Sequence, residues 1–460
     1  MSETTYSPRL RTGILLCGAG TAGAYHAGVL RALVEAGVKI DVVAAHGAGM
    51  TTALAVAIDG GAKVWDPAGP WTDQRMRQSY RWRAALRWAA YGLLAAMGLL
   101  LAPLVVLVLA ALAYGLGTLA ALVNLETLAS ELIAAHSRAV AFLFDPPVLP
   151  TVVPRAIVLA VLVVAVILCA AAVQAARHER SRRRFQGAFW WRLLGSPLEA
   201  QQPAGTLIDT LWQLVRGASK EPRPKSTEVG RRYVDVLADN FGQPGFREVL
   251  LAAHDIDARR DLVGAVLPAQ ARAGFEARRA TGGVREAETL DFTGPLRDHV
   301  IDFVVAGLRL PVATEPHPLQ FPAESFWRGE RHRLCDRPEL AVRLIDELAA
   351  IGVEQVILVS AAPPAATPHG MRTRPGTMRA RVGEVLRAVE TAALQDAWTA
   401  ASGRFYAGFV IRPDHNPIGP FDFGGAYDES SDRQRTIGEL IQLGYDDAYR
   451  QFIETVAATA

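Results

Sequence analysis

Two glycine-rich turns near the start of the chain hold the residues best suited to chemistry. The first, Gly-Ala-Gly-Thr-Ala-Gly at residues 18–23, follows an apolar run at 11–17. The second, Ala-His-Gly-Ala-Gly at residues 45–49, follows the segment 38–44. Glycines at a helix start let backbone N–H groups converge on an anion or oxyanion, where the helix dipole helps. The second spacing is typical of a nucleophile elbow, a sharp turn that presents one side chain above a sheet edge.

Each turn is predicted to join a buried strand to a helix. The first strand covers 11–17 and its helix runs to Ala36, with Gly37 as its cap. The second strand covers 38–44, and a helix begins near Met50. The N-terminal part is therefore predicted to be α/β.

The order and spacing of these residues resemble the opening of patatin-like phospholipases. The matching stretches are 18–23, 28–37, Asp41 and 45–49. In that family the glycine loop is the oxyanion hole, and a Gly-x-Ser-x-Gly elbow supplies the nucleophile. The resemblance assigns anion binding to one group of residues, Gly18, Ala19, Gly20 and Gly23. It assigns the elbow to another, Ala45, His46, Gly47, Ala48 and Gly49.

The chain departs from the family pattern at the residues that do the chemistry. Ala22 stands where the family usually has Arg or Lys, Ala45 replaces the first elbow glycine, and Gly47 replaces the serine. Glycine has no side chain to attack an ester, so serine-type acyl transfer cannot run from this position. His46 is interpreted as a histidine bonded within the elbow, with the alternative that it acts as a base or nucleophile on a bound lipid.

The family's catalytic aspartate has three candidate positions here. The turn at 326–330 matches it by order, which places Arg328 at the aspartate position. Asp336 lies eight residues further on and is an alternative. Asp422, in Phe-Asp-Phe-Gly-Gly at 421–425, is a second alternative, although a turn or capping role in a Pro/Gly-rich loop is favoured.

A Gly-x-Gly-x-x-Gly turn after a strand is also a dinucleotide fingerprint. A dinucleotide site needs an acidic residue at the end of the next strand. That strand has Asp41 near its start and ends in Ala-Ala-His. A nucleotide-binding oxidoreductase is therefore only a remote alternative.

A long apolar insertion separates the two halves of the predicted domain. Residues 88–125 carry no charged side chain, and Pro103 lies near the middle of this run. As one helix the run would be roughly 57 Å long, nearly twice the ~30 Å thickness of the hydrocarbon core of a bilayer. Residues 156–176 are of span length. Arginines flank both runs, which predicts that both ends face the cytoplasm and that 126–155 is a short external loop. Trp82-Arg83 and residues 190–192 are predicted interfacial anchors; a buried hairpin of a soluble domain is the alternative.

Composition excludes several other classes. Lys plus Arg is 48 and Asp plus Glu is 46, and no nucleic-acid motif is present, so we predict no nucleic-acid binding. Cys17, Cys169 and Cys335 are too far apart to suggest a disulfide framework or zinc site. We expect neither a metal nor a cofactor. The N-terminus lacks the pattern of a secretory signal.

The sequence thus predicts a three-layer α/β/α patatin-like domain with a mostly parallel sheet, split by a transmembrane helical hairpin. The expected parts are 1–75, the insertion 76–200, and 201–460. The expected function is a degenerate enzyme of lipid metabolism that binds lipid or a partner, with an active acyl hydrolase as the alternative. We expect an inner-membrane protein with its domain in the cytoplasm, contacts with membrane lipids, and homo-oligomers through the membrane helices.

Overall fold

The computed structural model describes residues 6–58, 62–66, 69–144, 152–178, 195–277, 284–365 and 377–457. The chain divides into two compact units. The first comprises Met1–Arg81 and Leu198–Ala460, and the second is the intervening Trp82–Pro197. The short strands β3 (Arg81–Trp82) and β4 (Leu198–Glu199) form a two-stranded sheet of their own.

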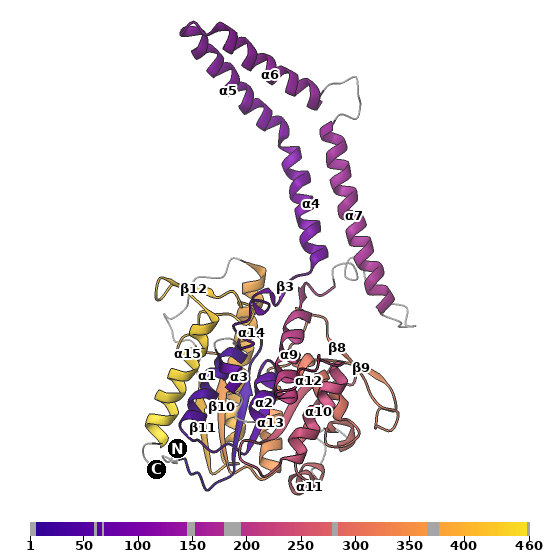
Figure 1. Cartoon of the computed structure of the whole chain (residues 1–460), viewed down its shortest axis with the longest axis vertical. Helices are drawn as coiled ribbons and strands as arrows, with labels where there is room; N and C mark the ends of the chain where they lie inside the picture. Colours follow the sequence, from indigo (N-terminus) through magenta and orange to yellow (C-terminus); the bar gives the residue numbers. More distant parts are fainter. Residues whose placement is uncertain are drawn as a thin grey trace. The chain divides into compact units, whose positions relative to one another are not determined.

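The first unit is built on one large sheet (Figure 1). Its strands are β1 (Thr12–Cys17), β2 (Val42–Ala45), β5 (Glu248–Asp255), β6 (Arg260–Val266), β7 (Thr289–Asp291), β8 (His317–Gln320), β9 (Arg331–Cys335), β10 (Gln355–Ser360) and β11 (Ala407–Ile411). Among the described residues the order is β11-β10-β1-β2-β5-β6-β7. The pairs from β11 to β5 and the pair β6–β7 are parallel; β6 and β9 run antiparallel to β5, and β8 runs antiparallel to β9. The predicted α/β class with a mostly parallel sheet is confirmed.

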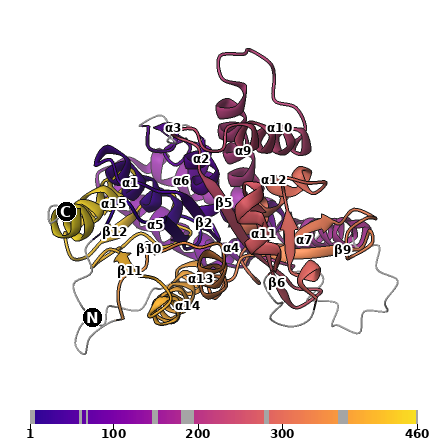
Figure 2. The same ribbon diagram turned by 90° about the horizontal axis from the view of Figure 1, so that it is seen from below.

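The central strands are buried on both faces, which is why they read as continuous apolar runs. In β1, Ile14 and Leu16 point into one hydrophobic core, and Leu15 and Cys17 into the other. Figure 2 shows α1 and α2 on one side of the sheet and α13 and α14 on the other. Each face of the sheet therefore has its own layer of helices.

The helices on the first face are α1 (Ala22–Glu35), α2 (Gly49–Ala57), α3 (Ala62–Trp65), α9 (Gln201–Arg216), α10 (Ser226–Asp239), α12 (Val300–Gly307) and α15 (Ile437–Ala448). Those on the second are α11 (Ala269–Ala277), α13 (Leu340–Ala350) and α14 (Met378–Ala401). Smaller elements are η2 (Met76–Gln78), η3 (Arg285–Ala287), η4 (Arg297–His299), β12 (Ala426–Asp428) and β13 (Arg433–Arg435).

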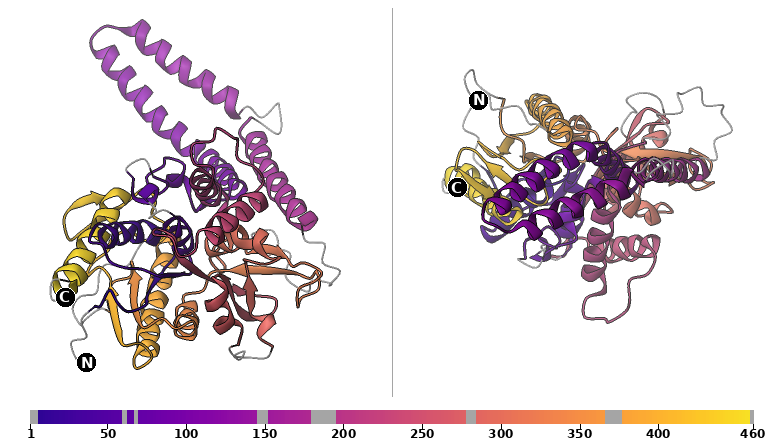
Figure 3. Two further views of the ribbon diagram at one scale, coloured as in Figure 1. Left: turned by 60° about the horizontal axis from the view of Figure 1, so that its bottom comes forward. Right: turned by 90° about the horizontal axis from the view of Figure 1, so that it is seen from above.

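Helix α15 packs closely against helix α1; they are the yellow and the indigo helix in Figure 3. An added Cβ at Gly28 would lie 1.8 Å from the carbonyl oxygen of Ile441, and one at Gly444 would lie 2.2 Å from that of Tyr25. Helix α15 continues through Gly444, and the π-helix η5 (Tyr449–Ala457) begins after Ala448.

The second unit consists of α4 (Ala84–Leu100), α5 (Ala102–Leu122), α6 (Glu126–Phe144) and α7 (Val152–His178). Helix α4 packs on α7, and α5 packs on α6. The run 88–125 is split at Leu101, two residues before Pro103, because proline favours the first turn of a new helix. Asn124, with φ +60°, reverses the chain after α5.

Among the described residues of this unit, two helical segments are long and apolar enough to cross a membrane. They are Ala102–Leu122 and Val152–Ala171, with mean hydropathies of 2.3 and 2.9. The predicted loop 126–155 is wrong as secondary structure, because most of it forms α6, whose Ala- and Leu-rich sequence has high helix propensity. The predicted anchor at 190–192 lies outside the described residues.

Candidate functional site

Both glycine turns lie at the carboxyl edge of the parallel strands. β1 ends at Cys17 and β2, its neighbour, ends at Ala45. Gly18 and Gly47 have φ values of +127° and +62°, which residues other than glycine rarely adopt. The Ala48 N–H donates to the carbonyl oxygen of Gly18 at 2.9 Å, so the two turns are tied together.

The elbow has the shape of a strand–turn–helix junction but no room for a nucleophile. An added Cβ at Gly47 would lie 2.4 Å from the carbonyl oxygen of Gly18 and 2.8 Å from Oδ2 of Asp336. An added Cβ at Gly49 would lie 2.7 Å from the carbonyl oxygen of Leu16. The space that a serine side chain needs at position 47 is thus already filled by the chain.

His46 and Asp336 form a buried pair beside the elbow. Nδ1 of His46 lies 3.0 Å from Oδ1 of Asp336, and both side chains are 1% exposed. Asp336 directly follows β9, which pairs with the end of β5 and so brings the carboxylate to this sheet edge. The Asp336 N–H donates to the carbonyl oxygen of Arg309 at 2.8 Å, which fixes its backbone.

The electrostatics favour a charged ring on His46 and a neutral ring on His26. Burial lowers the pKa of His46, but the Asp336 carboxylate, together with the Cys17 side chain, more than reverses this and raises the pKa well above its ordinary value. Burial lowers the pKa of His26 to about 3, despite the hydrogen bond between its Nε2 and the carbonyl oxygen of Cys17. Asp336 therefore sets the protonation state at the elbow.

Glu390 occupies the donor that the glycine loop offers. It lies on α14, is 8% exposed, and its Oε1 accepts the backbone N–H of Ala19 at 2.8 Å. Burial raises the pKa of Glu390 to about 7, against the Ala19 N–H, which lowers it, while the charge of Asp336 raises it further. A carboxyl group of the chain itself therefore stands where the loop would bind an anion.

The segment 412–425 covers the other end of the glycine loop. The Thr21 N–H donates to the carbonyl oxygen of Pro420 at 3.1 Å, and its hydroxyl donates to that of Gly419 at 2.8 Å. An added Cβ at Gly20 would lie 1.8 Å from the Pro420 oxygen, so glycine is required there. The loop is thus buried against the chain and bonded to it on both sides.

The structure brings some of the predicted site residues together and separates others. Gly18, Ala19, Gly47, His46 and Asp336 meet at the elbow, as the contacts above establish. Gly23 is further along α1, where an added Cβ would lie 2.2 Å from the ring of Trp71.

The other two acid candidates lie elsewhere. Arg328 lies in the loop between β8 and β9, is exposed, and has φ +43°. Oδ2 of Asp422 accepts the Gly419 N–H at 3.1 Å within its own turn, and Asp422 makes no contact with His46 among the described residues. Asp336 is thus the candidate acid that reaches the elbow.

Sequence reasoning missed Glu390 entirely. A signal was present, because Glu390 shares the buried face of α14 with Ala393, Leu394 and Ala397 at the spacing i, i+3, i+4, i+7. A carboxyl group on the apolar face of a helix needs a partner, since an unpaired buried charge is costly.

The buried elbow and glycine loop offer little room to bind a metal ion or a cofactor. Within the described residues there is no cluster of His, Cys, Asp and Glu suited to a metal ion. A dinucleotide pyrophosphate would have to displace Glu390 from the Ala19 N–H and the Pro420 carbonyl from the Thr21 N–H. What remains at the elbow is a buried group of ionisable side chains, His46, Asp336 and Glu390, with the free thiol of Cys17 beside His46 and no side chain at position 47.

Comparisons with known proteins find a likeness among solved structures. No protein-family model and no curated protein sequence matches the chain. Among solved structures, VipD from Legionella pneumophila is similar over 99% of this chain and 69% of that chain, at 10% sequence identity and a TM-score of 0.32. The functional argument therefore rests on the residues of this chain.

Proposed function

We propose that this chain is a patatin-like protein that has lost hydrolase chemistry and serves lipid metabolism by binding lipid or a partner at the cytoplasmic face of a membrane. The observation that carries the proposal is the filled elbow. Gly47 has no side chain, and the carbonyl oxygen of Gly18 lies 2.4 Å from where its Cβ would be. The resemblance of the glycine turns to the patatin-like opening supplies the family, and the filled elbow supplies the loss of activity.

The occupied oxyanion loop supports the same conclusion. An oxyanion hole works through N–H donors held free for the charge that develops in the transition state. Here the Ala19 N–H is bonded to the carboxyl group of Glu390 at 2.8 Å. An ionised carboxyl group at this place would also repel an oxyanion.

One observation favours the second candidate, an acyl hydrolase that uses His46. An imidazole bonded to a buried carboxylate is the base arrangement of many hydrolases. Nδ1 of His46 lies 3.0 Å from Oδ1 of Asp336, and the Cys17 thiol also interacts with the ring. Against this, His46 is 1% exposed, and its raised pKa keeps the ring protonated and unable to accept a proton.

Ester hydrolysis separates the two candidates. Purified full-length protein in maltoside micelles would be assayed on short-chain p-nitrophenyl esters and phospholipids, beside the variants His46→Ala and Gly47→Ser. We expect wild type and His46→Ala to give the same background rate. We also expect no gain from Gly47→Ser, because the Gly18 carbonyl occupies the space that the new side chain needs. Wild-type turnover that His46→Ala abolishes would establish the hydrolase instead.

The membrane part of the proposal rests on exposed apolar helices. Only 11% of each of the two span-length segments is buried within the structure, although both are strongly apolar. Side chains such as Leu107 and Val158 are 67% and 66% exposed. A lipid bilayer would cover surfaces of this kind and remove the cost of exposing them to water.

Extraction and labelling test the anchoring and the side of the membrane. We expect the protein to stay with membranes at alkaline pH. Cysteine labelling in intact cells would compare Glu384→Cys, on the exposed face of α14, with Asn124→Cys at the α5–α6 turn, in a background lacking Cys169. We expect an impermeant maleimide to miss Glu384→Cys until the cells are lysed. Release at alkaline pH would remove the proposed anchoring.

A further inference from the structure

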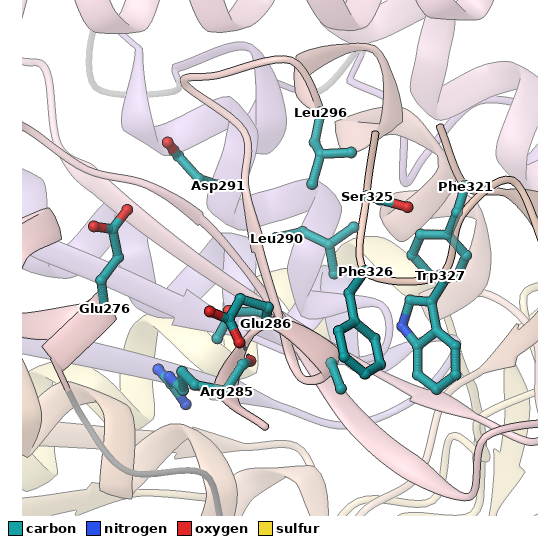
Figure 4. Close-up of a pocket in the computed structure, with 12 residues that line it drawn as sticks. Glu276, Arg285, Glu286, Leu290, Asp291, Leu296, Phe321, Ser325, Phe326 and Trp327 are labelled. Atoms are coloured by element: carbon teal, nitrogen blue, oxygen red, sulfur yellow. Dashed lines mark hydrogen bonds between the residues drawn. The ribbon is translucent and has the colours of Figure 1, made fainter. Parts of the chain in front are cut away.

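A cavity of about 340 Å³ lies beside β7, the edge strand of the main sheet, and nothing described so far gives it a role. Figure 4 shows aromatic rings on one side of it and carboxylates on the other. The rings come from the segment between β8 and β9, and the carboxylates from α11, η3 and β7. The six side chains are Phe321, Phe326, Trp327, Glu276, Glu286 and Asp291.

The aromatic side forms a corner that is held in place. The rings of Phe326 and Trp327 are 5.2 Å apart and meet at 89°, and Phe321 lies 6.2 Å from Trp327. Behind them His332 lies 4.5 Å from Trp327, and its Nδ1 lies 2.5 Å from Oδ2 of Asp255. Phe326 is 47% exposed, so its ring is presented rather than packed away.

The side opposite the rings carries three carboxylates and one arginine. Arg285 also lines the cavity, but its guanidinium donates to both oxygens of Glu347, each at 2.8 Å, and lies over the ring of Phe275. Asp291 accepts the Thr293 N–H at 2.9 Å and is paired with Arg272, whose guanidinium lies 3.5 Å from its Oδ2. Glu286 forms no ion pair with any residue that the structure describes, and its exposed carboxylate faces the cavity.

We propose that this cavity binds a small organic ammonium ion, of the class that includes choline and related quaternary amines. Two perpendicular aromatic faces attract a cation through their quadrupoles. The Glu286 carboxylate balances the charge without needing a hydrogen bond from the ligand, which a quaternary ammonium cannot donate. The cavity lies within the size range of sites for small ligands. Because it lies at β7, away from the elbow, the proposal does not rest on the function proposed above.

The test uses choline and its neutral isostere, 3,3-dimethylbutan-1-ol, which has the same shape without the charge. Binding of both to the full-length protein in maltoside micelles would be measured by isothermal titration calorimetry. We expect choline to bind at least tenfold more tightly than the isostere. We expect Phe326→Leu to weaken choline by about 2- to 30-fold, the range of one cation–π contact, and Glu286→Gln to weaken it as well.

Matched controls guard against general effects of substitution. Tyr406→Leu removes an aromatic ring that is 68% exposed outside the cavity, and Glu384→Gln removes an exposed carboxylate on α14. Both controls are expected to leave choline binding unchanged. Because Phe326 and Glu286 are exposed, their variants are expected to fold normally, and thermal unfolding curves would verify it.

Competition identifies the source of the cation. Displacement of choline by phosphocholine and by micelles of short-chain phosphatidylcholine would assign a lipid headgroup, whereas displacement by free phosphocholine alone would assign a soluble ligand. Both results support the site. The proposal is overturned if choline does not bind, if choline and its isostere bind equally, or if both cavity variants retain wild-type affinity.

Discussion

Replacing Gly47 with alanine tests the filled elbow with the smallest side chain. The backbone has φ +62°, and placing an L-residue there costs about 1–2 kcal/mol. The added Cβ would in addition lie 2.4 Å from the Gly18 carbonyl oxygen and 2.8 Å from Oδ2 of Asp336, closer than Cβ atoms approach such atoms. Overpacking of this kind costs roughly 1–3 kcal/mol. The free energy of unfolding should therefore fall by about 2–5 kcal/mol.

Gly352→Ala is the matched control. Gly352 also has a positive φ, +80°, but an added Cβ there meets nothing within 4 Å, so only the backbone cost of about 1–2 kcal/mol applies. Thermal unfolding of both variants, followed by circular dichroism in the same micelles, would show the difference at roughly 2 °C per kcal/mol. If Gly47→Ala unfolds at the same temperature as Gly352→Ala, the space at the elbow is open and the reasoning is refuted.

Three further predictions concern the buried groups around the elbow and the helix crossing. The raised pKa of Glu390, about 7 against an ordinary 4.5, means that the folded state holds a proton that the unfolded state releases. The stabilising effect of this protonated carboxyl group is present below pH 4.5 and is lost as the pH rises towards 7. Glu390→Gln mimics the protonated group and should therefore be more stable than wild type at pH 8, by on the order of 3 kcal/mol. Denaturation at pH 5 and pH 8 measures this difference in stability, and an equal difference at both pH values contradicts the prediction. Asp336→Asn breaks the buried pair with His46 and should lower the free energy of unfolding by about 3–5 kcal/mol. Because the pKa of His46 is raised, this loss of stability should be largest at acid pH and shrink as the pH rises through that pKa. A loss that does not depend on pH would contradict the pair. Gly444→Ala would place a Cβ 2.2 Å from the Tyr25 carbonyl oxygen and should lower the unfolding temperature, whereas Gly438→Ala on the same helix, with only a Thr436 hydroxyl at 3.8 Å, should not; equal melting temperatures would contradict the close crossing.

The parts of the fold that the sequence predicts best are those with a local signal. The residues from 11 to 57 give strand, glycine turn and helix twice, because apolar runs and glycines mark each boundary. The start of β2 differs, at Val42 instead of residue 38. The Asp41 carboxylate accepts the Thr12 N–H at 2.8 Å and so ends the connecting turn just before the strand.

The site depends on contacts that no local pattern records. Order along the chain alone matches Arg328 to the family's aspartate position. The sequence cannot place that position more exactly, because the length of the β8–β9 loop cannot be read from the residues in it. Pairing of β9 with the end of β5 brings Asp336 to the elbow. Glu390 meets Ala19 across 371 positions of sequence, which only the fold can establish.

Hydrogen exchange at the backbone amide of Ala19 tests most directly whether the glycine loop is closed. Mass spectrometry of peptides that begin just before and just after this residue would isolate its exchange rate in the full-length protein. With its N–H bonded to buried Glu390 at 2.8 Å, Ala19 should exchange as slowly as the central strand residues Ile14 and Leu16. Exchange as fast as in an exposed loop would show that the loop opens to a ligand, and would contradict the account of a sealed, inactive elbow.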